Sequence, residues 1–529
     1  MIRRKTQDLT FWRDEFTVTS DDLQHVSSLL IEDELPRSTE ELARAIVRRR
    51  CQLEEALVRR AMASGKLYRP SESYGVGERV VFPALGYTAG EVTGMRRGYN
   101  PEYGDFQVIQ VAFEQGAKRE FAAEFLGDHI LNVDPESEFS TGDELLRPEQ
   151  LADLYGPLIS ERLDKRLEDE PSFVRLAGEW FRRDLLVEVH IGHLNLAEAV
   201  LDIAGGGPLP TEDLLGDLEL PDEVTPQLRI FSLNYALQED PRFDEVGPAG
   251  EVLWYLSSLE PENVQIVPDR LQYRLAPYDP DLLTSEMVAL EQHLHDEWSE
   301  FNLAAGAETE TGTVVLTYPH WRSGTLPYSS GLRGIFPTGR TQRIHFTFVD
   351  SDTGEEMPGW VLREGRYVSG LADWYRSNDV PVGAYLDLAR GDRPGVVVIS
   401  RRGRRSRREW MRVVLPVEGR LTFEMRKHPI ACEYDELMGL AVEEQAAVDA
   451  LAVLALRRER PLAQIVAQVF PELAKLSPQG SVHASTLYSA VNVVKRVPPG
   501  PLFAELVAGS AYMPVGDNYW VLTSTPSGD

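Results

Sequence analysis

Cysteine is nearly absent from this sequence, and long apolar runs are missing. Its 529 residues include only two cysteines, Cys51 and Cys432, too few for a disulfide framework or a four-cysteine zinc module. No stretch approaches the roughly 20 apolar residues that span a bilayer, and the basic N-terminus lacks the apolar core of a signal peptide. These absences predict a cytoplasmic protein without membrane contact, and association with the nucleoid is compatible with them.

The motifs of the common enzyme classes are also missing. No Gly-x-x-x-x-Gly-Lys phosphate loop, Gly-x-Ser-x-Gly elbow or Gly-x-Gly-x-x-Gly fingerprint occurs. The common magnesium-dependent restriction-nuclease fold needs a carboxylate two positions before a lysine, and none of the seven lysines has one. The sequence therefore predicts a non-enzymatic protein with no catalytic residue and no cofactor. A nuclease or other enzyme with an unfamiliar central site is the third alternative.

The histidines offer little support for a metal site. His190 and His193 lie three residues apart, and His293 and His295 lie two apart. Either pair would need distant ligands to complete a zinc site. Cys432 stands alone and cannot build a structural zinc centre. We expect structural roles for these side chains and predict no metal.

Acidic residues are abundant but unevenly placed. The 84 acids outnumber the 54 cations and give a formal net charge of -30, which would repel DNA if it were spread evenly. Residues 37–69 carry nine cations against four acids, and residues 390–412 carry nine arginines against two acids. Residues 132–170 and 205–262 have net charges of -8 and -11. A polyanion should therefore meet only the basic segments, while the acidic ones stay solvated or face a basic protein.

Residues 20–70 contain the start and stop signals of three helices followed by a hairpin. Ser38 or Thr39 caps the second helix, and Gly65 ends the third. This order predicts a winged helix, a fold whose third helix enters the major groove while neighbouring side chains contact phosphate.

The helical pattern over residues 39–61 contains a conflict. In one straight helix, Arg49 and Arg60 would fall on the apolar face, so we expect a break near Arg50. With that break, the cations of this module face outward. The predicted DNA contacts here are Arg44, Arg48, Arg59, Arg60, Lys66 and Arg69.

Short alternating runs follow from Gly75, each closed by glycine or a polar turn. They predict a small five-stranded β-barrel. The hairpin GERVVFPALGYTAGEV resembles KOW or Tudor-like barrels of transcription-associated proteins. That resemblance implies a docking surface rather than an enzyme.

Two later segments look like the ending of the first module. Residues 231–256 and 502–522 both run helix, aromatic strand, Val-Gly turn and Trp-containing strand. With PRFDEVG, LWYL and AYMPVGDNYWVL as the matching residues, they resemble HARE-type winged helices and the related domain of the RNA polymerase delta subunit. The resemblance implies association with nucleic acid or the transcription machinery rather than catalysis.

The predicted third helices of these two copies are poor in cations. The second offers Arg229 in an acidic module, and the third, over residues 501–509, has no lysine or arginine. In the last copy, Asn492 and Arg496 project from the preceding helix together with Ser489. We include Asn492 and Arg496 among the predicted DNA contacts, with a solvated helix face as the alternative.

Residues 310–425 are rich in β-branched runs and contain a dense arginine segment. SRRGRRSRREW lies between two such runs, and its Gly403 predicts the tip of a hairpin. The predicted phosphate contacts of this ribbon are Arg401, Arg402, Arg404, Arg405, Arg407 and Arg408. The strand pattern resembles pseudobarrel DNA-binding domains. The alternative is a solvated turn that balances the acidic domains.

We therefore predict a multidomain α+β protein with three winged-helix modules, one small β-barrel and a central β-rich, pseudobarrel-like domain. The predicted boundaries are 1–72 for the first winged helix, 73–132 for the barrel, 133–185 for an acidic helical linker, 186–280 for the second winged helix, 281–440 for the β-rich domain and 441–529 for the third winged helix. The predicted function is binding of double-stranded DNA in transcription or chromosome handling. A protein-interaction scaffold, for example an accessory factor of RNA polymerase docked through the acidic modules, is the alternative.

Overall fold

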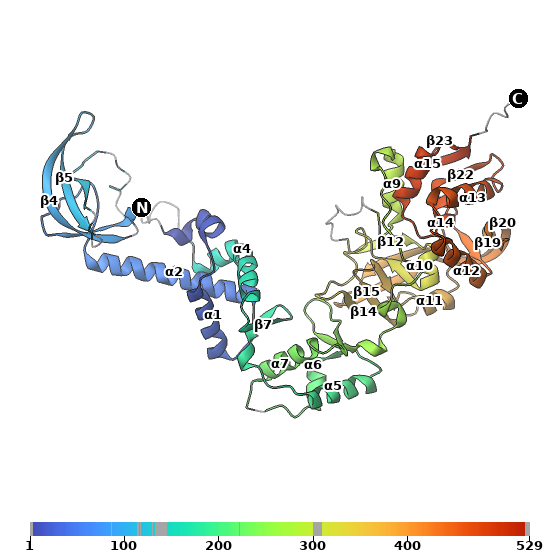
Figure 1. Cartoon of the computed structure of the whole chain (residues 1–529), viewed down its shortest axis with the longest axis horizontal. Helices are drawn as coiled ribbons and strands as arrows, with labels where there is room; N and C mark the ends of the chain where they lie inside the picture. The colour runs from blue at the N-terminus through green and yellow to red at the C-terminus, as the bar shows by residue number, and fades with distance from the viewer. Residues whose placement is uncertain are drawn as a thin grey trace. The chain divides into compact units, whose positions relative to one another are not determined.

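The computed structural model describes residues 4–85, 87–113, 116, 118–127, 129, 131–132, 145–221, 223–299 and 309–523. It has a mixed α+β architecture with several separate sheets (Figure 1). Two compact units divide the chain: residues 1–189 with 220–235, and residues 190–219 with 236–529. Among the described helices, none has the length and apolarity to cross a bilayer.

The first unit begins with three helices and a three-stranded antiparallel sheet. Its elements are α1 (Ser20–Asp33), β1 (Arg37–Ser38), α2 (Thr39–Ser64), α4 (Pro148–Glu168), β7 (Phe173–Leu176) and β8 (Glu179–Arg182). The sheet order is β1-β8-β7. Ile46, Ile159 and Trp180 are buried together in its core. Ser38 caps α2 through a reciprocal bond with Glu41, as the sequence predicts.

Helix α2 contradicts the expected break near Arg50, because it runs unbroken from Thr39 to Ser64. The conflict on its apolar face disappears because the face is buried only in its first half. Ile46 is fully buried, whereas Leu57 is 61% exposed. Arg49 lies on the same face and its Nη1 is 3.1 Å from Nδ1 of His25.

A five-stranded sheet lies in the chain between α2 and α4. Its strands are β2 (Lys66–Leu67), β3 (Arg79–Phe82), β4 (Thr88–Asn100), β5 (Gly104–Phe113) and β6 (Lys118–Ala123). The order is β2-β3-β4-β5-β6, with β2 and β3 parallel and every other pair antiparallel. Phe82, Val92 and Ile109 fill its core. Strands β3 to β6 coincide with the alternating runs of the sequence.

The order helix, strand, helix, helix, strand, strand occurs twice more. The middle copy has α5 (Ile191–Ile203), β9 (Leu209–Pro210), α6 (Thr211–Leu215), α7 (Pro226–Gln238), β10 (Phe243–Glu245) and β11 (Leu253–Leu256). The last has α13 (Leu462–Ala474), β22 (Ser481–His483), α14 (Ala484–Val491), α15 (Pro499–Ala508), β23 (Tyr512–Gly516) and β24 (Tyr519–Leu522). All three sheets place the third strand between the first and the second. We call these three copies the N-terminal, middle and C-terminal modules.

The second unit contains a seven-stranded sheet with two short helices. Its elements are β12 (Thr311–Val315), α10 (Tyr318–Ser323), β13 (Thr325–Pro327), β14 (Arg343–Asp350), β15 (Glu356–Leu362), β16 (Tyr367–Ser369), α11 (Ala372–Ser377), β17 (Tyr385–Arg390) and β18 (Val396–Arg401). The order is β12-β17-β18-β14-β15-β16-β13, and only β14 and β18 pair in parallel. Helices α8 (Glu262–Gln265) and α9 (Ser285–Leu294) precede it.

A long two-stranded ribbon follows this sheet. It consists of β19 (Gly403–Val417) and β20 (Arg420–Cys432), and β21 (Leu440–Val442) pairs with β19 before α12 (Gln445–Arg457). Met411 and Ile430 bury their side chains in the core of the seven-stranded sheet. Val414 and Phe423 are buried with the C-terminal module. The ribbon is therefore anchored on both sides within its unit.

Candidate nucleic-acid interface

The ribbon differs from the predicted hairpin in the position of its turn. β18 belongs to the seven-stranded sheet and β19 to another sheet. Gly403 is the first residue of β19 and pairs with Cys432, so it does not lie at a hairpin tip. The turn is formed by Glu418 and Gly419, which adopt the positive φ values of 48° and 76° that tight hairpins require. Four of the six arginines therefore lie at the start of β19, at the end of the ribbon remote from the turn, whereas Arg401 ends β18 and Arg402 links the two strands.

Three of the six predicted ribbon arginines have partners within the protein. Arg401 donates to the carbonyl of Asn378 at 2.9 Å. Arg402 makes two 2.9 Å bonds to the carboxylate of Asp387, and this hydrogen bonding lowers the pKa of Asp387. Arg404 bonds Glu409 at 2.6 Å. Two of these guanidinium groups, those of Arg402 and Arg404, are therefore neutralised by carboxylates within the protein.

The other three, Arg405, Arg407 and Arg408, are exposed. Within the described part of the chain, none of them has a carboxylate within ion-pair distance. Neighbouring residues of a strand point to opposite faces, so Arg407 and Arg408 place a cation on each face of the ribbon. No internal carboxylate has to be displaced before these three groups meet a phosphate.

An aromatic side chain extends this cationic surface. Trp410 is 59% exposed and lies directly opposite Lys427 across the ribbon. The Lys427 ammonium stands 5.3 Å from the centre of the indole ring, a cation–π geometry. Arg408 lies two residues before Trp410 and hence on the same face. Sequence reasoning missed Trp410 and Lys427, although alternation along 408–410 could have placed the tryptophan beside the arginine.

The predicted contacts on α2 are less available. Arg44 pairs with Asp153 at 3.0 Å and Arg48 with Glu149 at 3.6 Å, so the cations of α2 face carboxylates of α4. Arg59 pairs with Glu55 one turn earlier.

The remaining predicted cations of this segment lie at the end of α2 and beyond it. Arg60 is exposed without an ion pair among the described residues. Lys66 bonds Glu72 at 3.0 Å and stands over the Tyr74 ring. Arg69 is half-buried, and its backbone bonds the Tyr74 hydroxyl. These residues belong to the first unit, and the ribbon arginines belong to the second.

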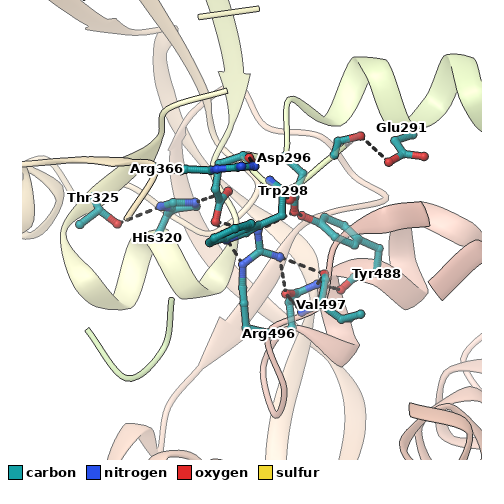
Figure 2. Close-up of polar contacts among 12 residues, drawn as sticks. Glu291, Asp296, Trp298, His320, Thr325, Arg366, Tyr488, Arg496 and Val497 are labelled. Atoms are coloured by element: carbon teal, nitrogen blue, oxygen red, sulfur yellow. Dashed lines mark hydrogen bonds and ion pairs between the residues drawn. The ribbon is translucent and has the colours of Figure 1, made fainter. Parts of the chain in front are cut away.

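The last predicted pair, Asn492 and Arg496, is buried, so neither the DNA contact nor the solvated face expected there exists. Asn492 is 2% exposed, and its amide donates to two backbone carbonyls. Arg496 is 7% exposed and lies 2.7 Å from both Asp296 and Glu297 (Figure 2). A guanidinium that is already buried and neutralised offers nothing to phosphate.

Arg496 belongs to a buried polar cluster that joins the C-terminal module to the seven-stranded sheet. The Tyr488 hydroxyl donates to Asp296 at 2.6 Å, and Nε2 of His320 lies 3.1 Å from Glu297. Burial opposes ionisation of Glu297, but Arg496 and His320 outweigh it and lower the pKa of that carboxyl to about 2. The two carboxylates follow α9, His320 belongs to α10, Tyr488 to α14, and Arg496 lies beyond the end of α14. Figure 2 shows the side chains of this cluster gathered around Arg496. The arrangement is that of a structural ion-pair network.

The first histidine pair and His428 have structural partners. His190 and His193 stack at 3.6 Å and cap the start of α5 by reciprocal bonds to its backbone. His428 lies 3.3 Å from Glu443, and burial raises the pKa of the Cys432 thiol. In the described ranges, no group of three or more His, Cys, Asp or Glu side chains is arranged to hold a metal ion.

No family model, no curated protein and no solved structure matches the chain.

Proposed function

We propose that this chain is a non-enzymatic DNA-binding protein of transcription or chromosome handling, and that it holds DNA by the β19–β20 ribbon. The observation that carries the proposal is the set of three exposed arginines, 405, 407 and 408, within four consecutive positions of β19. None of them has a carboxylate partner among the described residues, whereas the neighbouring Arg402 and Arg404 are paired. Phosphate is the natural partner of such groups, because a guanidinium meets two oxygens at once.

The placement of these cations supports contact with a polyanion despite the net charge of -30. The ribbon carries cations on both faces, and a two-stranded ribbon fits the major groove. The acidic segments, residues 132–170 and 205–262, are separate from the ribbon in the sequence, and their charge limits nonspecific affinity.

We further propose that the three modules are winged helices, that the five-stranded sheet is a small barrel and that the seven-stranded sheet is a pseudobarrel-like domain. The repeated element order and strand order support the first assignment. The resemblance of the last two modules to HARE-type winged helices and the delta-subunit domain supports an association with the transcription machinery.

These modules suit protein contacts better than DNA contacts. The third helix of the N-terminal module is α4, whose exposed charged residues are four acids and one lysine: Glu149, Asp153, Glu161, Lys165 and Glu168. In the C-terminal module, α15 is almost wholly buried. A groove-reading helix needs an exposed cationic or polar surface. This favours the second candidate function, a scaffold that docks on a basic surface of RNA polymerase.

The DNA proposal is tested by affinity for a 30-base-pair duplex at ~0.1 M salt. The variant Arg405→Ser, Arg407→Ser, Arg408→Ser should bind about tenfold more weakly or worse, because three counterion-releasing contacts are lost. The matched control is Arg274→Ser, Arg376→Ser, Arg393→Ser, which removes three exposed arginines of the same unit that pair with carboxylates. Equal losses of duplex affinity in both triple variants would show that the ribbon contributes only general positive charge and no specific contact.

The scaffold candidate is tested with purified RNA polymerase after nuclease treatment. Association that survives the nuclease, and that the ribbon variant retains, supports docking through the modules. Association that vanishes with the nuclease assigns the contact to DNA.

A further inference from the structure

Trp410 is unusual among the tryptophans of this chain. All nine lie within the described residues, and the other eight are buried or half-buried. Trp410 is the exposed one, with 59% of its surface accessible. An exposed indole forgoes the free energy that burial of its large apolar surface provides. Its position on a cationic ribbon therefore favours a role in binding a ligand.

The residues around Trp410 define the chemistry of that ligand. Lys427 stands over one face of the indole at 5.3 Å, and the ring remains largely open to solvent. Arg408 lies on the same side of the ribbon, about 7 Å along the strand. Met425 and Pro429 are exposed on the same side of the paired strand. The surface therefore combines a flat aromatic ring with two cations, which we call the Trp410 patch (Arg408, Trp410, Lys427).

A flat ring flanked by cations matches unpaired nucleotides better than paired ones. In a duplex, the faces of the bases are covered by their neighbours, and only edges and phosphates are reachable. In a single strand, each base can stack on an aromatic side chain while the adjacent phosphates meet cations. An acidic peptide would satisfy Arg408 and Lys427 but leave the indole without a partner.

We propose that the Trp410 patch binds unpaired nucleotides of single-stranded DNA, with one base stacked on Trp410 and the flanking phosphates held by Arg408 and Lys427. The inference rests on the proposed DNA-binding function and narrows its substrate to DNA that contains unpaired nucleotides. Arg405 and Arg407 contribute charge to single strands and duplexes alike.

The test compares a 20-nucleotide oligo-dT with a 20-base-pair duplex on the full chain. Trp410→Ala should weaken oligo-dT binding about 5- to 150-fold, the range for loss of one aromatic stacking contact, and change duplex binding less than about twofold. Trp410→Phe should retain most of the oligo-dT affinity. Oligo-dT should also quench the solvent-accessible tryptophan fluorescence of the wild type, and that quenching should disappear in Trp410→Phe.

Three outcomes overturn the inference: unchanged oligo-dT affinity in Trp410→Ala, equal loss on both DNA forms, or competition by poly-glutamate as strong as by oligo-dT at equal charge. Each of these can occur while the Arg405, Arg407 and Arg408 triple variant still loses duplex binding, in which case the DNA-binding function stands without the stacking site. Full duplex affinity in that triple variant refutes the proposed function itself.

Discussion

At the residue scale, the structure separates the arginines into paired and unpaired ones. Arg402 and Arg404 look like phosphate ligands in the sequence, yet each has a carboxylate below 3 Å. Arg496 is the extreme case, since its two carboxylates precede it by about 200 residues. No local sequence pattern predicts a pairing over such a distance in the chain, and the sequence alone therefore assigns Arg496 to the surface.

Loss of Arg496 should destabilise the second unit strongly. Arg496→Ala leaves Asp296 and Glu297 buried beside each other without a cation, which costs about 3–5 kcal/mol in free energy of unfolding. Chemical denaturation followed by tryptophan fluorescence measures it. As the control, Arg376→Ala removes an exposed arginine paired with Asp373 and should change stability by less than about 1 kcal/mol. A similar effect of both changes would show that the buried network contributes little.

Glu260 should make stability depend on pH. Burial raises its pKa to about 7, assisted by the charge of Asp244 and opposed by Arg343. Because the folded carboxyl holds its proton more strongly than the unfolded one, this contribution is present below pH ~4.5 and is lost as the pH rises toward 7. Glu260→Gln should therefore flatten the fall in Tm between pH 5 and pH 7.

The Glu260 comparison is made against wild type at each pH because His345 acts in the opposite direction. Burial lowers the pKa of His345 to about 4, so its contribution is lost as the pH falls from about 6.5 toward 4. Because both proteins contain His345, its contribution cancels in the difference in Tm between the variant and the wild type. A difference curve without slope from pH 5 to pH 7 would contradict the assignment to Glu260.

At the element scale, local signals predict many elements but not their partners. The Ser38 cap, the helix end at Gly65 and the Trp-containing strands β11 and β24 follow from short patterns. The expected break in α2 and the expected turn at Gly403 are both wrong. The first assumes that the apolar face of a helix is buried along its whole length, and the second that a glycine between two β-branched runs marks a turn. Tertiary packing decides both: α2 extends past its core, and β18 and β19 join different sheets.

A proline placed in α2 tests its continuity. Gln52 lies near the position of the expected break and is exposed, so replacing its side chain removes no buried packing. Gln52→Pro should cost about 3 kcal/mol and reduce the helical circular dichroism, because proline removes an interior hydrogen bond. Gln52→Ala serves as the control and should leave both quantities nearly unchanged. If Gln52→Pro left both the stability and the helical signal unchanged, α2 would be interrupted near residue 50, contrary to the structure.

At the scale of the whole molecule, the charge is partitioned by module. Acidic surface on α4 neutralises Arg44 and Arg48 and leaves the third helix of the N-terminal module unsuited to DNA. In the second unit, three exposed arginines without carboxylate partners among the described residues, 405, 407 and 408, lie close together on the ribbon. On the proposed function, a chain with a net charge of -30 binds a polyanion at this ribbon. DNA contact by the arginine segment stays a prediction, and the predicted position of the turn at Gly403 is wrong.

The salt dependence of duplex binding tests the central claim most directly. Each phosphate contact contributes roughly 0.9 to the negative slope of log affinity against log salt concentration. We expect the slope of the Arg405→Ser, Arg407→Ser, Arg408→Ser variant to be shallower than that of wild type by about two to three, and the slope of the Arg274, Arg376 and Arg393 control to match wild type. Identical slopes for wild type and the ribbon variant would contradict DNA contact through the ribbon.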